Sequence, residues 1–253
     1  EVSGRVYPVE VIYQPFEVAS EEEGEITYVD AAVQAVERIV FTTDYGDALV
    51  FMPGERDIRE TSDALEGRFA GGAEIIPLFG RLSAGEQQRV FAPTQRRKII
   101  LATNIAETSL TVDGVRVVVD SGLAREPRFD ARTGMTRLTT VSTSRASAEQ
   151  RAGRAGRTEP GAAYRLWSKL EHGTRAKHRT PEILQGDLAG LMLELAAWGV
   201  GSDPARPTGD LVFVDAPPAG ALGQARDLLI DLHAIDATTG ALTPLGRDML
   251  ALP

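Results

Sequence analysis

The chain has 253 residues, of which 43% are apolar and 25% are charged, a composition typical of a globular protein with a packed core. It contains no cysteine and only three histidines, which excludes disulfides and thiolate metal sites and argues against a histidine metal site. No run of about 18 apolar residues predicts a membrane span. Because residue 1 is Glu and no basic-then-apolar leader is present, we expect a piece of a longer chain, with one large or two smaller domains.

The net charge of −9 is unevenly distributed along the chain. Residues 125–179 hold 13 Lys and Arg against 5 Asp and Glu, a local charge of +8, so the remainder carries −17. A protein that coats nucleic acid without selectivity would be basic throughout. One basic segment in an acidic chain instead predicts a localised anionic partner, with a solvated basic surface as the plainer alternative.

The first 43 residues combine β-rich runs with a helix. Residues 9–13 and 26–29 are the β-rich runs, and the acidic segment 21–24 between them is typical of a loop. Apolar side chains at helical spacing predict a helix over 31–40.

From residue 44, apolar runs alternate with helical stretches. The continuous apolar run at 48–52 is typical of a strand buried on both faces. Further strands are expected at 75–78, 98–103, 115–120 and 162–167, and helices at 56–69 and at 83–91, where Ser83 and Glu86 fit a capping box. The alternation predicts an α/β fold: a parallel sheet with helices on both faces.

Two further segments stand apart from this alternation. Residues 125–141 alternate around a turn at 130–134, which predicts a basic β-hairpin that projects from the sheet. After it, helices are expected at 183–198, 221–235 and 245–252, with a short hairpin at 239–243. These elements describe a small winged-helix-like domain, so we predict two domains, 1–178 and 179–253.

Residues 150–157 carry the densest set of functional side chains, in the sequence QRAGRAGR. If the segment is one α-helix, Gln150, Arg154 and Arg157 fall within an arc of about 60°. Two guanidiniums and an amide that converge suit a polyphosphate, because arginine offers forked donors to phosphate oxygens. Its two glycines each cost about 1 kcal/mol of helix stability relative to alanine, which close approach of a neighbouring backbone would explain. An exposed arginine-rich helix is the plainer alternative.

Polar loops follow three of the predicted strands. They are residues 103–114 (TNIAETSLTVDG), residues 53–55 (the PGE of LVFMPGE at 49–55) and residues 79–83 (FGRLS). In open parallel sheets, ligands bind beyond the carboxyl ends of the strands, and backbone N–H groups at a helix start can hold a phosphate. Each loop taken alone is also an ordinary polar loop. Phe91, at the end of a predicted helix, is either a core residue or an aromatic that stacks on a base.

Together these stretches closely resemble the second RecA-like domain of the DEAH-box helicases of superfamily 2. Residues 150–157 match motif VI of that family, QRxGRxGR, at every fixed position, and residues 103–112 match motif V. The resemblance runs from about residue 44 to the C-terminus and extends to motif IV at 49–55 and the following motif at 78–91. Within the family, residues 121–129 and 146–151 are most similar to the bacterial HrpB-type branch.

The resemblance implies a role for each matching residue. Arg154 and Arg157 match the arginine fingers that reach the ATP phosphates, and Gln150 matches the residue that orients the attacking water. The implied nucleotide-binding residues are Phe91 on the adenine, Ser109 as a sensor of nucleotide state, and Thr111 and Asp113 near the ribose. The implied contacts to the nucleic-acid backbone are Gly54, Arg81, Leu82, Thr103 and Asn104. The hairpin 125–141 matches the strand-separating hairpin.

Two departures from the family pattern limit this transfer. Gln185 stands where many relatives carry Arg, and Gly80-Arg81-Leu82 replaces the commoner Gly-Ser-Leu. The domain contact at Gln185 and the nucleic-acid backbone contact at Arg81 are therefore the least specific parts of the resemblance.

The phosphate-cradling P-loop, GxxxxGK[ST], and the DEAH motif are absent from the sequence. In the family these elements lie in a preceding RecA-like domain and hold Mg²⁺ and the phosphates. The resemblance therefore implies half of a bipartite ATP site, with the preceding domain of the same polypeptide as a partner. The Mg²⁺ ligands are expected in that domain, and no metal site is expected within this chain. The resemblance also implies a cytoplasmic protein without membrane contact.

The implied function is that of the C-terminal motor half of an ATP-dependent helicase that grips single-stranded nucleic acid, by family habit RNA. Contacts to phosphate and sugar would make the binding sequence-tolerant. The alternative is a non-catalytic, helicase-derived module that binds nucleic acid or a protein, although the intact Gln150, Arg154 and Arg157 argue against it. A dinucleotide-binding oxidoreductase is excluded because no GxGxxG follows a predicted strand.

Overall fold

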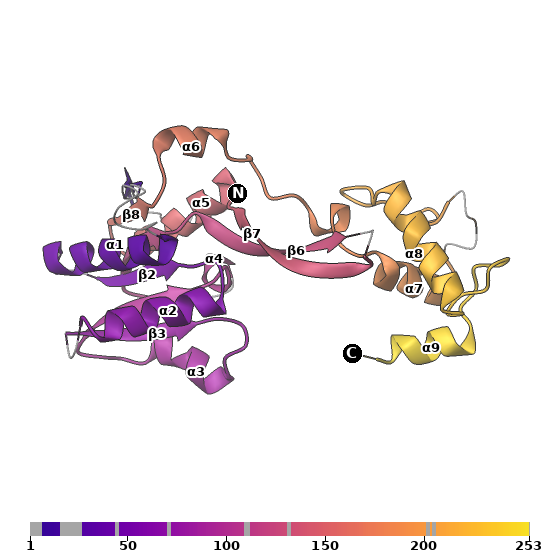
Figure 1. Cartoon of the computed structure of the whole chain (residues 1–253), viewed down its shortest axis with the longest axis horizontal. Coiled ribbons are helices and arrows are strands. Elements are labelled where there is room, and N and C mark those ends of the chain that lie inside the picture. The colour runs from indigo at the N-terminus through magenta and orange to yellow at the C-terminus, as the bar shows by residue number, and fades with distance from the viewer. Residues whose placement is uncertain are drawn as a thin grey trace. The chain divides into compact units, whose positions relative to one another are not determined.

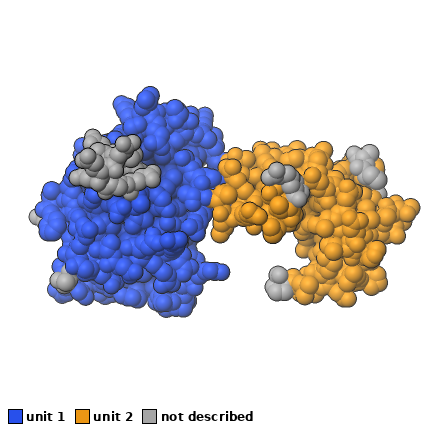
Figure 2. All heavy atoms as spheres, in the orientation of Figure 1, with its two compact units in different colours: residues 1–126, 140–179 blue, residues 127–139, 180–253 orange. Residues whose placement is uncertain are grey.

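The computed structural model describes residues 7–15, 27–43, 46–69, 72–108, 112–130, 133–200, 203 and 206–252. The chain divides into two compact units (Figure 2). The first comprises residues 1–126 and 140–179, and the second comprises residues 127–139 and 180–253.

A six-stranded parallel sheet organises the described part of the first unit (Figure 1). The strand order is β1-β8-β5-β2-β4-β3. The strands are β1 (Val9–Tyr13), β2 (Asp47–Phe51), β3 (Ala73–Leu78), β4 (Arg97–Ala102), β5 (Val115–Asp120) and β8 (Gly161–Arg165). In the central register Val50 lies opposite Leu101 on one side and Val119 on the other. The predicted parallel sheet is confirmed.

Helices cover both faces of this sheet, because successive side chains of each strand point to opposite sides. Ala48 and Val50 pack on the face of α1 (Tyr28–Thr42) and α2 (Glu55–Glu66). Leu49 and Phe51 pack on the opposite face, with Ala106 and Ala152. That face carries α4 (Ile105–Thr108) and α5 (Arg145–Ala152), and Val90, which follows α3 (Ala84–Gln88), packs there too. The continuous apolar runs of the central strands are thus explained by burial on both faces.

The start of α1 corrects the β-rich run expected at 26–29. Thr27 is the N-cap: its hydroxyl accepts from the backbone N–H of Asp30, and the Asp30 carboxylate accepts from the Thr27 N–H. This capping box satisfies two N–H groups that a helix start would leave unpaired. Tyr28 and Val29, residues typical of strands, are therefore helical. The capping box predicted for Ser83 and Glu86 is confirmed at the start of α3.

The predicted hairpin is confirmed as strands β6 (Leu123–Asp130) and β7 (Met135–Ser142), which form a two-stranded sheet. Gly134 in its turn has a φ of 64°, a left-handed conformation that glycine adopts without steric cost. After β8, a short helix α6 (Lys169–Thr174) completes the first unit.

The described part of the second unit is built on α7 (Ala189–Ala197), α8 (Ala219–Asp231) and α9 (Pro244–Leu250). Their apolar side chains share one core, and an antiparallel bridge joins Ile235 to Leu242 at the predicted short hairpin.

Three predicted helices are shorter in the structure than in the sequence interpretation. The helix expected at 183–198 is a 3-10 turn at Glu182–Leu184 followed by α7, and the Asp187 carboxylate between them accepts from the Ala189 N–H. The end of α8 comes at Asp231, since His233 takes a left-handed φ of 57° and turns the chain. Likewise α2 ends at Glu66, before the turn at Gly67.

Candidate nucleotide and nucleic-acid site

The residues predicted to touch nucleic acid gather at one edge of the sheet. Gly54 follows β2, Arg81 and Leu82 follow β3, and Thr103 and Asn104 follow β4. These strands are parallel neighbours in the order β2-β4-β3, so their carboxyl ends meet at the same edge. The side chains of Arg81 and Asn104 are exposed there, whereas Leu82 is half-buried against the core beneath α1 and α2. The loop residues predicted from sequence to contact nucleic acid therefore lie on one surface.

A buried carboxylate holds a cation beside this edge. Gly54 is the N-cap of α2, and a side chain in its place would meet the guanidinium of Arg125 at 3.0 Å. Asp57, which is buried, lies 3.7 Å from that guanidinium and accepts a hydrogen bond of 2.6 Å from the Tyr28 hydroxyl. Burial, together with this hydrogen bond to Asp57, raises the pKa of Tyr28 to about 12. Sequence reasoning counted Arg125 only as part of the basic segment and missed this cluster.

The motif VI segment is not the single α-helix that its interpretation assumed. It begins with α5, where the Ser144 hydroxyl accepts from the Ser147 N–H, and it changes to a 3-10 turn at Gly153–Gly156. A side chain at Gly156 would come within 2.6 Å of the Tyr7 carbonyl, so the expected close approach is confirmed there. The expectation is wrong for Gly153, because no atom in the described part of the chain lies within 4 Å of a Cβ added there. The 60° arc derived for one helix therefore does not hold.

The two predicted arginine fingers lie in this 3-10 region and differ in exposure. Arg154 is only 6% exposed, and its Nε donates to the Glu107 carbonyl oxygen at 2.9 Å, with Nη2 bonding to the same oxygen. Arg157 follows the turn and is exposed, as is Gln150 on α5. Burial, and then the positive charge of Arg157, lower the pKa of Arg154. An anion bound beside Arg154 and Arg157 would offset both of these effects on Arg154.

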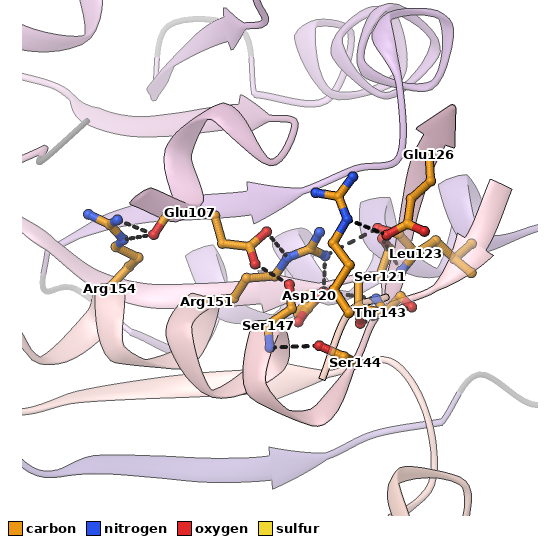
Figure 3. Close-up of polar contacts among 12 residues, drawn as sticks. Glu107, Asp120, Ser121, Leu123, Glu126, Thr143, Ser144, Ser147, Arg151 and Arg154 are labelled. Atoms are coloured by element: carbon orange, nitrogen blue, oxygen red, sulfur yellow. Dashed lines mark hydrogen bonds and ion pairs between the residues drawn. The ribbon is translucent and has the colours of Figure 1, made fainter. Parts of the chain in front are cut away.

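Arg151, which sequence reasoning did not single out, lies at the centre of a polar network (Figure 3). Its buried guanidinium lies 2.8 Å from Asp120 and 3.4 Å from Glu107, donates to the Leu123 carbonyl oxygen at 3.2 Å, and lies over the Phe51 ring. The Ser147 hydroxyl bonds to the same Glu107 carboxylate. The available signal was an arginine inside motif VI together with carboxylates near two strand ends.

The nucleotide-binding candidates are placed only in part. Phe91 ends a 3-10 turn and is 49% exposed, while the adjacent Val90 is buried, so the core interpretation of Phe91 is wrong. Asp113 is exposed in the turn that enters β5, at the sheet edge opposite to Thr103. Ser109 and Thr111 lie outside the described residues.

A second group of buried arginines surrounds Trp167. Arg165 donates to Glu149 at 2.7 Å and to the Tyr13 hydroxyl at 2.8 Å. Arg175 stacks over the Trp167 ring at 4.1 Å and donates to the Gly122 carbonyl oxygen at 2.7 Å. Because Gly122 precedes β6, Arg175 braces the base of the hairpin, whereas Arg165 contacts neither Gly122 nor β6 in these bonds.

Neither a metal centre nor a membrane span emerges from the described residues. They contain no group of three or more His, Cys, Asp and Glu side chains that could hold a metal ion. None of their helices is long and apolar enough to cross a bilayer.

Comparison with known proteins decides the family. The model of the helicase conserved C-terminal domain matches residues 31–159, about half of the chain. The chain belongs to the helicase C-terminal domain family, in its DEAH-box branch. The winged-helix part of the helicase-associated domain (HA2) matches residues 225–253, which agrees with the small second domain predicted from sequence.

Relatives of this helicase family align over almost the whole chain. The chain is 44% identical to the ATP-dependent RNA helicase HrpA of Escherichia coli over 100% of its own length and 19% of that protein. It is 41% identical to HrpB of the same organism over 98% of the chain and 29% of the relative. A crystal structure described as the Escherichia coli DEAH/RHA helicase HrpB superposes with a TM-score of 0.86, covering 98% of this chain and 30% of that one. The chain thus spans less than a third of these relatives.

Proposed function

We propose that this chain is the C-terminal motor half of an ATP-dependent RNA helicase. The support is its membership of the helicase family, the RNA helicase relatives, and the cationic 3-10 turn at Gly153–Gly156. In this proposal residues 1–178 form the second RecA-like domain and residues 179–253 the winged-helix-like domain. A preceding RecA-like domain of the same polypeptide contributes the P-loop and the Mg²⁺ ligands.

The catalytic residues of the proposal are Gln150, Arg154 and Arg157. Burial first, and then the charge of the neighbouring Arg157, lower the pKa of Arg154, and a bound polyphosphate would stabilise its charged form. When bound, ATP supplies the phosphoryl group that is transferred to water. The guanidiniums stabilise negative charge that develops on that group, and Gln150 orients the water. The backbone bonds of Arg154 to Glu107 fix its guanidinium before ATP arrives.

The remaining nucleotide contacts belong to the same proposal. Phe91 offers an exposed ring for the adenine, and Asp113 an exposed carboxylate for the ribose. Ser109 is assigned as the sensor of nucleotide state and Thr111 as a further contact near the ribose.

Single-stranded RNA is the proposed partner at the carboxyl ends of β2, β3 and β4. The proposed contacts are Gly54, Arg81, Leu82, Thr103 and Asn104. Exposed Arg81 suits a phosphate, whereas the Leu82 side chain is packed against the core, so we assign it a backbone contact. Such contacts bind the sugar–phosphate backbone without reading bases.

The observation that carries the proposal is the pairing of buried Arg154 with exposed Arg157 in a family match that includes motif VI. ATP hydrolysis by the longer protein, with its P-loop domain, tests it when single-stranded RNA and DNA are compared. We expect stimulation by RNA, and no hydrolysis by the 253-residue chain alone, because half of the electrostatic clamp is missing. A longer protein that binds RNA but never hydrolyses ATP would instead identify a binding module.

A further inference from the structure

Glu107 contacts two arginines of motif VI through different groups. Its backbone carbonyl oxygen accepts from Arg154, the buried arginine finger of the proposed function. Its carboxylate accepts from Arg151 and from the Ser147 hydroxyl. One residue of α4 therefore joins the nucleotide-facing cation to a second, wholly buried cation.

Arg151 extends this connection to the base of the hairpin, as Figure 3 shows. Its Nη1 donates to Asp120 at 2.8 Å and to the carbonyl oxygen of Leu123, the first residue of β6, at 3.2 Å. The same Asp120 carboxylate oxygen accepts from the Gly122 N–H at 2.8 Å. The polar contacts thus run without a break from Arg154 to the start of the hairpin.

Burial makes these contacts interdependent. The side chains of Arg151, Asp120 and Glu107 are 1%, 3% and 13% exposed, so water cannot readily replace a partner that moves away. A buried charge that loses its partner is strongly destabilised. The Phe51 ring beneath the guanidinium further limits its movement. A displacement of Arg154 that shifts the Glu107 backbone must therefore be followed by Arg151 and by the strand start that it holds.

We propose that Glu107 and Arg151 are positioning residues that couple the nucleotide state sensed at Arg154 to the base of the β6–β7 hairpin. This inference rests on the proposed helicase function and adds to it the route by which ATP hydrolysis controls strand separation. The Glu107 carboxylate is the link that can be removed most cleanly, because Arg151 keeps Asp120 and Arg154 keeps the Glu107 carbonyl.

The test measures duplexes separated per ATP hydrolysed by the longer protein that contains this chain. Glu107→Ala is expected to lower this ratio about three- to tenfold while RNA-stimulated hydrolysis falls less. Arg151→Lys, which keeps the charge beside Asp120, should lower the ratio in the same direction. Glu149→Ala is the matched control: it removes another carboxylate–arginine pair from α5, with Arg165, and should leave the ratio unchanged.

The outcomes separate the inference from the function on which it rests. A lowered ratio for both variants, with a folded protein by thermal melting, supports the coupling. An unchanged ratio, including one in which hydrolysis and separation fall together, overturns the coupling but leaves the helicase proposal standing. Wild-type protein without RNA-stimulated hydrolysis overturns the helicase proposal and the coupling with it.

Discussion

Arg151 and Arg165 are both buried in the first unit, yet their surroundings differ. The side chains of Asp120 and Glu107, the partners of Arg151, are only 3% and 13% exposed, whereas Glu149, the partner of Arg165, is 63% exposed. A pair buried at both ends cannot exchange a partner for water, so its geometry is fixed. In a pair exposed at one end, water can solvate the exposed carboxylate again. Such a pair contributes more to packing than to a fixed side-chain position. The comparison separates a region that positions functional groups from one that braces the fold.

The largest expected effect concerns lysine substitutions in the two regions. Arg154→Lys in the longer protein should lower the maximal rate of ATP hydrolysis on the order of 10³-fold or more, because an ammonium cannot reproduce the planar fork of donors. Arg165→Lys should change that rate less than about twofold, because Arg165 bonds to Glu149 and Tyr13 and not to Glu107. Steady-state hydrolysis at saturating RNA measures both. Equal losses of hydrolysis rate in the two variants would contradict the different roles assigned to the regions around Arg151 and Arg165.

Stability should distinguish the two arginines directly. Arg151→Met leaves the buried carboxylate of Asp120 and the half-buried carboxylate of Glu107 without their cation and should cost about 3–5 kcal/mol of unfolding free energy. Arg165→Met should cost only about 1–2 kcal/mol, since Glu149 can return to water. Denaturant unfolding of the 253-residue chain gives both values when the slope is unchanged. A larger loss for Arg165→Met would contradict the comparison.

Gly122 lies where the two regions meet, and its substitution should have the next largest effect. Its N–H bonds to Asp120 and its carbonyl oxygen to Arg175, and its φ is 75°. An alanine Cβ would approach Arg175 and Trp167 at 2.6 Å, so Gly122→Ala should cost about 2–3 kcal/mol.

The control for this substitution is Gly134→Ala in the hairpin turn. Gly134 has a similar φ of 64°, but no atom of the described residues lies within 4 Å of its added Cβ. It should cost only about 1 kcal/mol, the left-handed strain alone. Equal losses in the two variants, measured by thermal unfolding, would mean that the approach to Arg175 and Trp167 has no energetic weight.

The smallest expected effect is a pH dependence in the Trp167 region. Burial first, and then the charges of Arg165, Arg175 and Arg145, lower the pKa of His172, while Glu149 opposes them. The unfolded chain therefore binds a proton more readily, and stability from this group is present above pH 6.5, the ordinary pKa, and is lost as the pH falls below it. His172→Gln should flatten this part of the stability profile between pH 7.5 and 5.5. A wild-type midpoint that rises on acidification relative to His172→Gln would contradict the sign.

The sheet could be predicted from sequence because its signal is local. Residues 48–52 and 117–119 are apolar at every position, which is typical of strands buried on both faces. Helix starts were less predictable: Tyr28 and Val29 favour strands, but the capping box of Thr27 and Asp30 determines their conformation.

The candidate site was likewise predictable where its residues are close in sequence, and not where they come from different elements. Motif VI marked the segment that carries Arg154 and Arg157, because these residues lie close together in the sequence. The Arg151 network could not be predicted, since Glu107, Asp120 and Leu123 come from three elements that only the folded sheet brings together. The approach of Tyr7 to Gly156, at the end of the 3-10 turn, likewise joins residues that are far apart in sequence.

The most direct test of the central claim, that motif VI of this chain serves ATP hydrolysis, is a steady-state ATPase titration with RNA. It compares Arg154→Ala and Arg157→Ala with Glu149→Ala in the longer protein. We predict that the maximal rate falls on the order of 10³–10⁵-fold in the first two variants and stays near wild type in the third. If these arginines only held RNA, more RNA would be needed for half-stimulation but the saturated rate would stay near wild type. That result would contradict the account.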